Sequence, residues 1–172
     1  MKKLIVVCLV CIAAGIVASI TRHPDHRPMP EQFREGMNRV RYLTYADPDF
    51  GYTFCYPSFF HRDDMPHYGP GHVQFSYHVL TDIVLECRVV PMKGYADRRH
   101  EFVRGGQMSG LDDSLYYAHH VRRGKLWYVL TLYYHADYAE ALAGLRHHVR
   151  TWRPFDGPKL TGRAHPNTKK PL

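Results

Sequence analysis

The stretch that decides the fold is Lys125–His135, which reads KLWYVLTLYYH. Its large apolar and aromatic side chains fall on both alternating phases, with Leu126, Tyr128, Leu130 and Leu132 on one and Trp127, Val129 and Tyr133 on the other. A strand that is apolar on both faces is typically covered on both faces. We therefore predict a central strand, and Leu115–Val121, across an Arg123-Gly124 turn, is predicted to form a hairpin with it.

Other segments carry strand patterns of different strength. Phe50–Tyr56 has an aromatic residue at every second position and ends at Pro57, which cannot donate to a sheet ladder. Val73–Val79 alternates apolar with polar residues, and Ile83–Val90 repeats that alternation, so these two segments are predicted to form a second hairpin. Arg98–Ser109 is ambiguous, because two adjacent glycines weaken any regular element.

The clearest helical pattern lies near the C-terminus. Apolar residues recur there at spacings of four, three, four and three: Tyr138, Leu142, Leu145, Val149 and Trp152. Asp137 is predicted to cap this helix, with Glu140 completing a capping box, and Pro154 to end it. The predicted fold class is α+β, a single antiparallel sheet of about five to six strands packed against a C-terminal amphipathic helix.

The first 20 residues form a separate unit. Lys2 and Lys3 precede the apolar run Leu4–Ile20, which is the pattern of a signal peptide with cleavage after Ser19. The run also reaches the lower limit of the roughly 17–25 residues that span a bilayer, so a retained membrane anchor is the alternative. A lipid anchor on Cys11 is a weaker option, because no small residue precedes that cysteine.

The rest of the chain divides into three parts. Residues 21–45 are predicted to be a polar, Pro-containing linker with a short helix, residues 46–156 the α+β globular domain, and residues 157–172 a disordered basic tail. Without the leader about 150 residues remain, which is the size of one domain.

The charge balance is moderately basic. The chain carries 23 Lys and Arg against 16 Asp and Glu, a net charge of +7 with neutral histidines, and removing Lys2 and Lys3 leaves +5. In an exported protein such an excess favours anionic envelope polymers or lipid head groups as partners over nucleic acid.

Two aromatic patterns together resemble the PsbP-like fold. The first is the aromatic-Gly-aromatic strand that runs into Tyr56-Pro57-Ser58-Phe59-Phe60, and the second is the Trp-Tyr strand followed by the amphipathic helix ending in Trp152-Arg153-Pro154-Phe155. The resemblance covers residues 47–155. It implies a curved antiparallel sheet with helices packed against it, as in an extrinsic photosystem subunit and small exported bacterial proteins. No ligand or metal residue of that family matches this sequence, so no function is carried over.

Cys55 and Cys87 are the cysteines of the predicted domain. An oxidising compartment would allow them to pair, but Cys55 alternates away from its aromatic neighbours whereas Cys87 is in phase with apolar ones, so they are expected on different faces. A disulfide needs Cα atoms within about 7 Å of each other. The sequence leaves three alternatives open: a bridge, two free thiols, or a reactive Cys55.

The histidines suggest two kinds of chemistry without a motif for either. The chain has 13 histidines, including the adjacent pairs His119-His120 and His147-His148, but neighbours on a strand point to opposite faces and do not chelate one metal ion. A cleft that gathers His78, His119, His120 and Cys55 would support a metal site or a thiol nucleophile. No catalytic residue, metal ligand or cofactor is predicted.

Basic and aromatic residues suggest a surface for anions. The predicted binding residues are Arg122, Arg123, Lys125, Tyr116, Tyr117 and Tyr134. Arg146, Arg150 and Arg153 lie beside the apolar stripe of the predicted helix, where solvation near the helix C-terminus accounts for them. They are also placed to join the tyrosines in binding an anionic glycan or lipid.

These observations favour a non-enzymatic binding or assembly module of the bacterial cell envelope, in the periplasm or at the outer face of the cytoplasmic membrane. The expected partner is an envelope protein, a glycan or an anionic lipid, with membrane contact only through an uncleaved leader. Two alternatives remain: an envelope hydrolase or thiol enzyme that uses Cys55 with a nearby histidine, and a histidine-based metal-binding protein.

Overall fold

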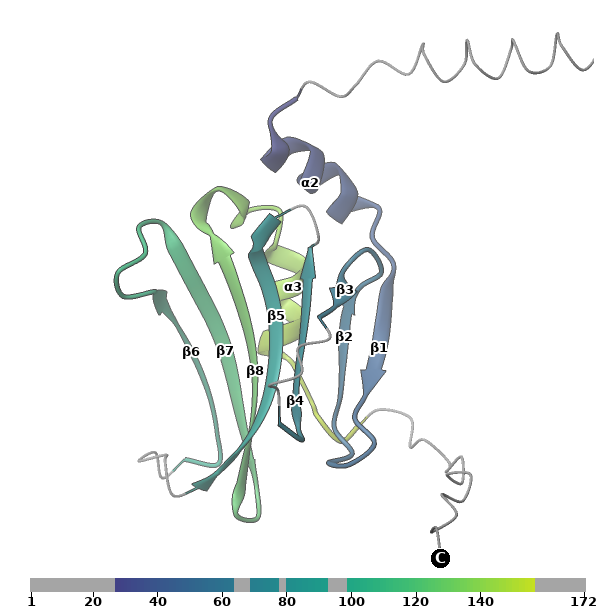
Figure 1. Ribbon diagram of the computed structural model, residues 1–172, viewed down its shortest axis with the longest axis vertical. Coiled ribbons are helices and arrows are strands. Elements are labelled where there is room, and N and C mark those ends of the chain that lie inside the picture. The colour runs from purple at the N-terminus through teal and green to yellow at the C-terminus, as the bar shows by residue number, and fades with distance from the viewer. Residues whose placement is uncertain (1–26, 64–68, 78–79, 93–98, 157–172) are drawn as a thin grey trace, which may run out of the picture.

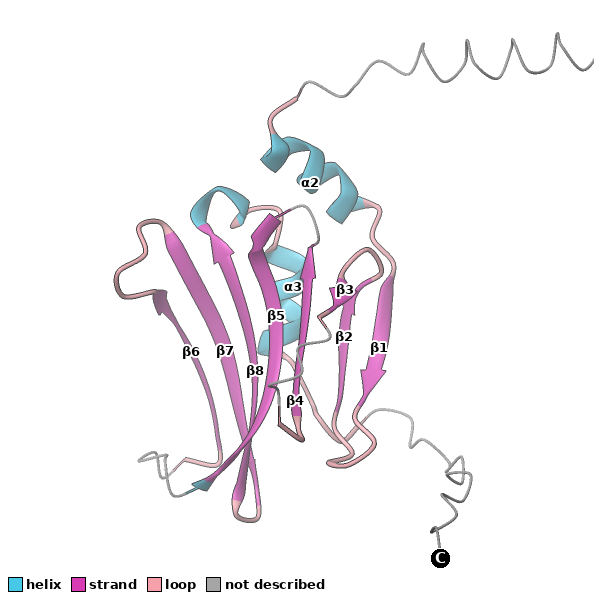
Figure 2. Cartoon of the chain, in the orientation of Figure 1, coloured by secondary structure: helices cyan, strands magenta, loops and turns pink. Residues whose placement is uncertain are grey.

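The computed structural model describes residues 27–63, 69–77, 80–92 and 99–156 (Figure 1). Strands make up most of the domain, with helices before and after them, as Figure 2 shows. Their order is α2 (Met29–Asn38), β1 (Tyr42–Ala46), β2 (Thr53–Pro57), β3 (His61–Arg62), β4 (His72–Tyr77), β5 (Leu80–Pro91), β6 (Glu101–Gln107), β7 (Ser114–Arg123), β8 (Leu126–His135), the 3-10 helix η2 (Ala136–Tyr138) and α3 (Ala143–Arg150). The predicted α+β class is confirmed.

The main sheet has six strands in the order β3-β4-β5-β8-β7-β6. All its pairings are antiparallel, and both predicted hairpins, β4 with β5 and β7 with β8, are present. The ambiguous glycine-containing segment is the edge strand β6, which pairs with β7. Gly124 makes the β7–β8 turn with a φ of 60°, a backbone conformation that glycine adopts without steric cost.

β8 occupies the predicted central position, between β5 and β7. Its Leu130 and Leu132 belong to the main core, whereas Trp127 and Val129 belong to a smaller cluster on the opposite face. All four side chains are buried, which explains why large apolar residues fall on both alternating phases of this strand.

The main core lies between one face of the six-stranded sheet and a second layer made by α3 and the β1–β2 hairpin. In Figure 1, α3 lies behind the sheet and β1 and β2 stand at its side. Leu145 and Val149 of α3 are fully buried in the same cluster as Leu85 of β5 and Leu130 of β8. Burial of each such side chain contributes about 1.5–3 kcal/mol to folding.

The N-terminal part of the domain departs from the prediction in two ways. Residues 21–45 were expected to form a linker with a short helix; the structure has the helix α2 there together with most of β1, and both are packed into the fold. Phe33 of α2 contacts the rings of Phe59, Tyr77 and Tyr138 at centroid distances of 5.9, 5.2 and 5.4 Å. The sequence contains too short a stripe, essentially Phe33 and Met37, to show this burial in advance.

The strand Phe50–Tyr56 also has a different place from the one expected. It forms β2, which pairs only with β1 in a separate two-stranded sheet. Two hydrogen bonds tie β2 to the C-terminal segment: Thr53 N–H donates to the main-chain oxygen of Pro154 at 2.7 Å, and Trp152 Nε1 donates to the main-chain oxygen of Thr53 at 2.6 Å. These hydrogen bonds hold the β1–β2 hairpin beside α3, and the hairpin does not extend the main sheet.

The predicted C-terminal helix is interrupted. The 3-10 helix η2 is capped by His135, whose Nδ1 accepts from the N–H of Asp137 at 3.3 Å, so Asp137 is not the cap. Four residues of turn follow before α3 begins at Ala143. The whole apolar stripe is nevertheless buried. The turns between η2 and α3 have backbone hydrogen bonds to residues three and four positions earlier, so the chain keeps a nearly helical path and the apolar residues stay on the side that faces the core.

Among the described residues no helix has the length and apolarity to span a membrane. The predicted leader, residues 1–20, and the predicted tail, residues 157–172, lie outside the described part of the chain.

Candidate functional site: a basic and aromatic hollow between α3 and β7

A surface hollow of about 300 Å³ lies between α3 and β7. It is lined by Tyr117 of β7 and by Ala143, Arg146, His147 and Arg150 of α3. We call it the α3–β7 hollow. Its walls combine an aromatic ring with two guanidinium groups and an imidazole.

The sequence of α3 explains why the two arginines face the same hollow. Leu145 and Val149 are the buried residues of the helix, and Arg146 and Arg150 each follow one of them. The two arginines are therefore one turn apart, with Cβ atoms about 5–6 Å from each other. Leu145 and Val149 fix the helix on the sheet and so place both arginines along one flank.

Tyr117 lies at the hollow because its neighbour in β6 is a glycine. Gly105 pairs with Tyr117, and a Cβ at Gly105 would be 3.1 Å from the ring atom Cδ2 of Tyr117. The ring therefore lies over the backbone of the edge strand. Gly106 likewise leaves room for the ring of Tyr116 on the other face of β6, where a Cβ would be 3.3 Å from Cε1 of Tyr116.

The positive charge of the α3–β7 hollow is not balanced locally. Within the described ranges, neither Arg146 nor Arg150 forms an ion pair, and no carboxylate lines the hollow. The Arg146 guanidinium carbon lies 6.0 Å from the ring centroid of Tyr134, and its Nε is shielded from solvent without a hydrogen-bond partner. Uncompensated, partly desolvated guanidinium groups attract anions.

The structure divides the binding residues predicted from the sequence. Tyr117 lines the α3–β7 hollow, and buried Tyr134 lies under Arg146. Tyr116 packs on the opposite face of the sheet, against the cluster that contains Trp127.

The predicted basic residues lie elsewhere. Arg122 and Arg123 end β7, and Lys125 is in the following turn. Arg122 and Arg123 are five and six residues along β7 from Tyr117, about 16–20 Å, and Lys125 is further along the chain. Arg123 is placed over the ring of Phe155 at 4.1 Å. The arginines at the hollow are instead Arg146 and Arg150. From the sequence they were expected either to be solvated or to join the tyrosines, and the informative signal was their spacing of four beside a buried stripe.

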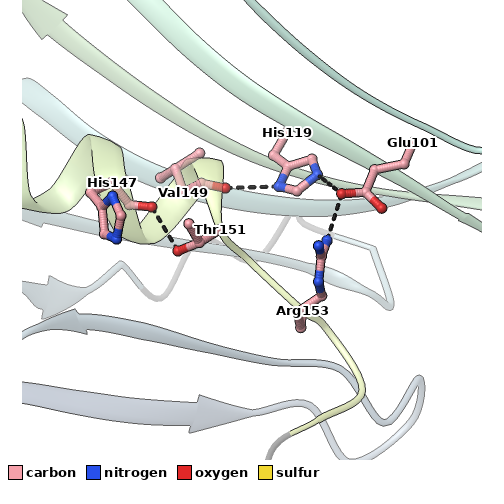
Figure 3. A network of polar contacts seen from close by, with 6 residues as sticks. All are labelled: Glu101, His119, His147, Val149, Thr151 and Arg153. Carbon is pink, nitrogen blue, oxygen red and sulfur yellow. Dashed lines mark hydrogen bonds and ion pairs between the residues drawn. The ribbon is translucent and has the colours of Figure 1, made fainter.

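A polar network that includes one buried histidine borders the C-terminal end of α3 (Figure 3). His119 of β7 is fully buried, with Nδ1 at 2.8 Å from the main-chain oxygen of Val149 and Nε2 at 3.0 Å from Oε1 of Glu101. Arg153 donates to the same carboxylate oxygen at 2.5 Å. This hydrogen bond from Arg153, aided by its charge and by His119, lowers the pKa of Glu101. The network fixes the end of α3 against β7 and β6.

A second hollow, of about 290 Å³, lies between the β1–β2 hairpin and α3. Its lining residues are Thr44, Thr53, Phe54, Cys55, Leu130, His148, Thr151, Trp152 and Arg153. Cys55 is half-buried, with Sγ 3.9 Å from Oγ1 of Thr44. The ring of His148 lies 4.2 Å from that of Tyr42, and burial, followed by repulsion from His147, lowers the pKa of His148. The structure thus brings one thiol and one imidazole to a common hollow.

The cleft considered from the sequence has a different composition. His119 points to α3 and is held in the network described above, whereas His120 is stacked on Phe102 on the opposite face at 4.3 Å. His78 lies outside the described residues. Among the described histidines, His148 is the one that shares a hollow with Cys55.

Both described cysteines are free thiols. Cys87 is fully buried in the main core, and burial raises its pKa well above the ordinary value. The disulfide that the sequence left open is therefore not formed in this structure. Over the same described ranges, no group of three or more His, Cys, Asp or Glu side chains is arranged to hold a metal ion.

The face of the sheet opposite α3 carries a different polar cluster. Glu86 of β5 is mostly buried and is contacted by His72 Nε2 at 2.6 Å and by the Tyr133 hydroxyl, which donates to it at 3.1 Å. Burial and the Glu86 charge raise the pKa of Tyr133. Because this carboxylate is already satisfied by protein donors, we assign the cluster a structural role.

Comparisons with known proteins add a weak structural likeness. Neither protein-family models nor curated proteins match the sequence. Among solved structures, the fold is similar to cyanobacterial PsbP (CyanoP) from Synechocystis sp. PCC 6803, with a TM-score of 0.42, 16% sequence identity, and coverage of 64% of this chain and 90% of that chain. This finding agrees with the weak PsbP-like resemblance of the sequence and says nothing about function.

Proposed function

We propose that the chain is a non-enzymatic binding module exported to the cell envelope, where the α3–β7 hollow binds an anionic group of an envelope glycan or lipid. The observation that carries the proposal is the pair Arg146 and Arg150, which share one hollow with Tyr117 and have no carboxylate among the described residues that line it. The basic n-region and apolar run at the N-terminus support export.

The chemistry of the hollow fits this role. Guanidinium groups bind phosphate and carboxylate oxygens through paired hydrogen bonds that are stronger than those between neutral groups. Tyr117 adds a rigid ring with a polar tip, which suits contact with a ligand that has both apolar and polar surface. The main core keeps α3 in place, so the site is held by rigid elements.

The test is binding of soluble anionic saccharides to the full-length chain in detergent, measured by thermal stabilisation and by calorimetry. A ligand that binds only the folded state raises the melting temperature with its concentration. We expect the stabilisation to disappear in the double variant Arg146→Gln with Arg150→Gln. The matched control is Arg122→Gln with Arg123→Gln, which removes the same charge from the far end of β7. Loss of binding in the control alone would contradict the assignment.

The shared hollow of Cys55 and His148 supports a second candidate, a thiol enzyme. A catalytic cysteine reacts as its thiolate and is activated by an adjacent base. The test is the rate of alkylation of Cys55 by iodoacetamide, followed by peptide mapping to separate it from the other cysteines. Rapid modification that slows in His148→Gln would support this candidate. Modification at the rate of an ordinary exposed thiol in both proteins would remove it.

A further inference from the structure

We infer that the anionic group held in the α3–β7 hollow is a phosphate monoester carried on a sugar. This inference rests on the proposed function and names the ligand class of the same site. It follows from the charge, the shape and the aromatic wall of the hollow.

The charge of the hollow matches a dianion. Arg146 and Arg150 contribute two fixed positive charges, and in the described part of the chain no carboxylate lines the hollow to reduce them. A phosphate monoester carries about −1.5 to −2 at neutral pH and has three acceptor oxygens. A sulfate ester or a carboxylate carries a single negative charge, so it would leave one guanidinium unneutralised.

The geometry lets both arginines reach one group. Their positions one turn apart bring the two guanidinium groups to the same flank of α3. The Nε of Arg146 is shielded from solvent, and its guanidinium lies over the Tyr134 ring at 6.0 Å, so its Nη atoms are the donors left for a ligand. The three oxygens of a tetrahedral phosphate can accept paired hydrogen bonds from two guanidinium groups at once, whereas the two oxygens of a planar carboxylate accept one such pair along one edge.

The aromatic wall indicates what carries the phosphate. Tyr117 lies over the backbone of Gly105, so its ring forms a flat side of the hollow beside the arginines. A sugar ring presents apolar C–H groups on its faces and hydroxyls at its edge, which suits contact with a tyrosine. The volume of about 300 Å³ is at the lower limit for ligand sites, so it accommodates one phosphorylated sugar unit and not a folded polymer.

The experiment is calorimetric titration of the full-length chain in detergent with glucose 6-phosphate, glucose 6-sulfate, glucuronate and inorganic phosphate. We expect glucose 6-phosphate to bind at least tenfold more tightly than the sulfate or glucuronate. Tyr117→Leu should lower the affinity for glucose 6-phosphate to that for inorganic phosphate, without changing the latter. The double variant of Arg146 and Arg150 should lose both.

The outcomes separate this inference from the proposed function. Equal affinities for phosphate, sulfate and carboxylate sugars, all lost in the arginine variant, would overturn the phosphate assignment and leave the proposed function intact. Binding of inorganic phosphate as tightly as the sugar phosphate would overturn the role of the sugar. No anion binding in any titration would overturn both.

A final arm distinguishes a free sugar phosphate from a lipid-borne one. Neutral phosphatidylcholine vesicles containing a glycolipid whose sugar carries a terminal phosphate monoester are mixed with the same protein. Sedimentation that glucose 6-phosphate reverses, and that the Arg146 and Arg150 variant lacks, identifies the lipid-borne form as a ligand of this site. Vesicle binding that glucose 6-phosphate leaves unchanged would overturn recognition of the sugar phosphate on lipid.

Discussion

His119 Nδ1 lies 2.8 Å from the main-chain oxygen of Val149, so one buried ring joins β7 to the last turn of α3. A carbonyl oxygen only accepts, so Nδ1 carries a hydrogen. The other nitrogen, Nε2, faces the carboxylate of Glu101 at 3.0 Å. The ring is therefore held at both nitrogens, and it joins β7 to α3 and to Glu101 of β6.

Replacement of His119 by Leu should destabilise the domain. The change removes the His119 donor from the Val149 oxygen, which then keeps only the longer hydrogen bond from the Trp152 N–H at 3.3 Å, and it removes the Nε2 partner of the Glu101 carboxylate. A hydrogen bond between neutral groups contributes about 1 kcal/mol and one to a charged group about 1.5–3 kcal/mol. We expect the free energy of unfolding, measured by urea denaturation at pH 7, to fall by about 3 kcal/mol. The control is His147→Gln on the exposed side of α3, which should remain within about 0.5 kcal/mol of the unchanged protein. Equal losses in both variants would contradict the role of His119.

Glu101 predicts a defined pH dependence. Its pKa is lowered in the folded state, chiefly by the hydrogen bond from Arg153. Stability from its ionised form is therefore fully present above the unfolded-state pKa of about 4.3 and is lost as pH falls through the lower folded-state pKa. Because Glu101 is 45% exposed, we expect Glu101→Gln to cost about 1 kcal/mol or less at pH 7.

The measurement for Glu101 is urea unfolding at pH 7 and at pH 3. The difference between Glu101→Gln and the unchanged protein should shrink at pH 3. A difference that grows as the pH falls would have the wrong sign and would exclude this ion pair as its source.

His148 predicts a second pH effect, in the mildly acidic range. Its pKa is lowered in the folded state, mainly by burial, so the unfolded chain takes up this proton more readily. The free energy of unfolding should decrease as pH falls below about 6.5, the usual histidine value, and this decrease should end once the folded-state ring is protonated. His148→Asn should make the fall between pH 7 and pH 5 shallower, whereas His100→Asn should not.

The paired glycines of β6 give a matched test of the α3–β7 hollow. Gly105→Ala brings a Cβ to 3.1 Å from the ring of Tyr117, and Gly106→Ala brings one to 3.3 Å from Tyr116 on the opposite face. Both variants should stay within about 1 kcal/mol of the unchanged stability, because ring displacement is offset by the lower chain entropy of alanine. Gly105→Ala alone should weaken anion binding several-fold, measured by calorimetry. Equal weakening by Gly106→Ala would remove Tyr117 from the site.

The elements that sequence predicted well are those whose pattern is local. The large apolar side chains on both alternating phases of Lys125–His135 identified β8 as central, since a strand that is buried on both faces is apolar on both faces. The separate β1–β2 sheet has no comparable pattern in the sequence, because the pairing of Thr53–Pro57 with β1 depends on residues far away, including Trp152 and Pro154. Strand pairing over long range is not encoded in a short stretch.

The candidate site shows the same division. The spacing of Arg146 and Arg150 beside the buried stripe is visible in the sequence, but the direction of Tyr117 depends on Gly105 in a neighbouring strand. Likewise, nothing in the two segments shows that Cys55 and His148 line one hollow, because the hairpin that carries Cys55 is placed by its bonds to the C-terminal segment.

Those bonds also constrain the order in which the polypeptide acquires its structure. Thr53 exchanges both of its main-chain hydrogen bonds with Trp152 and Pro154, a sequence separation of 99 residues for the tryptophan. A nascent chain therefore cannot dock its first hairpin until almost all of the domain has been synthesised. Truncation ahead of Trp152 would leave that hairpin undocked and prone to aggregate.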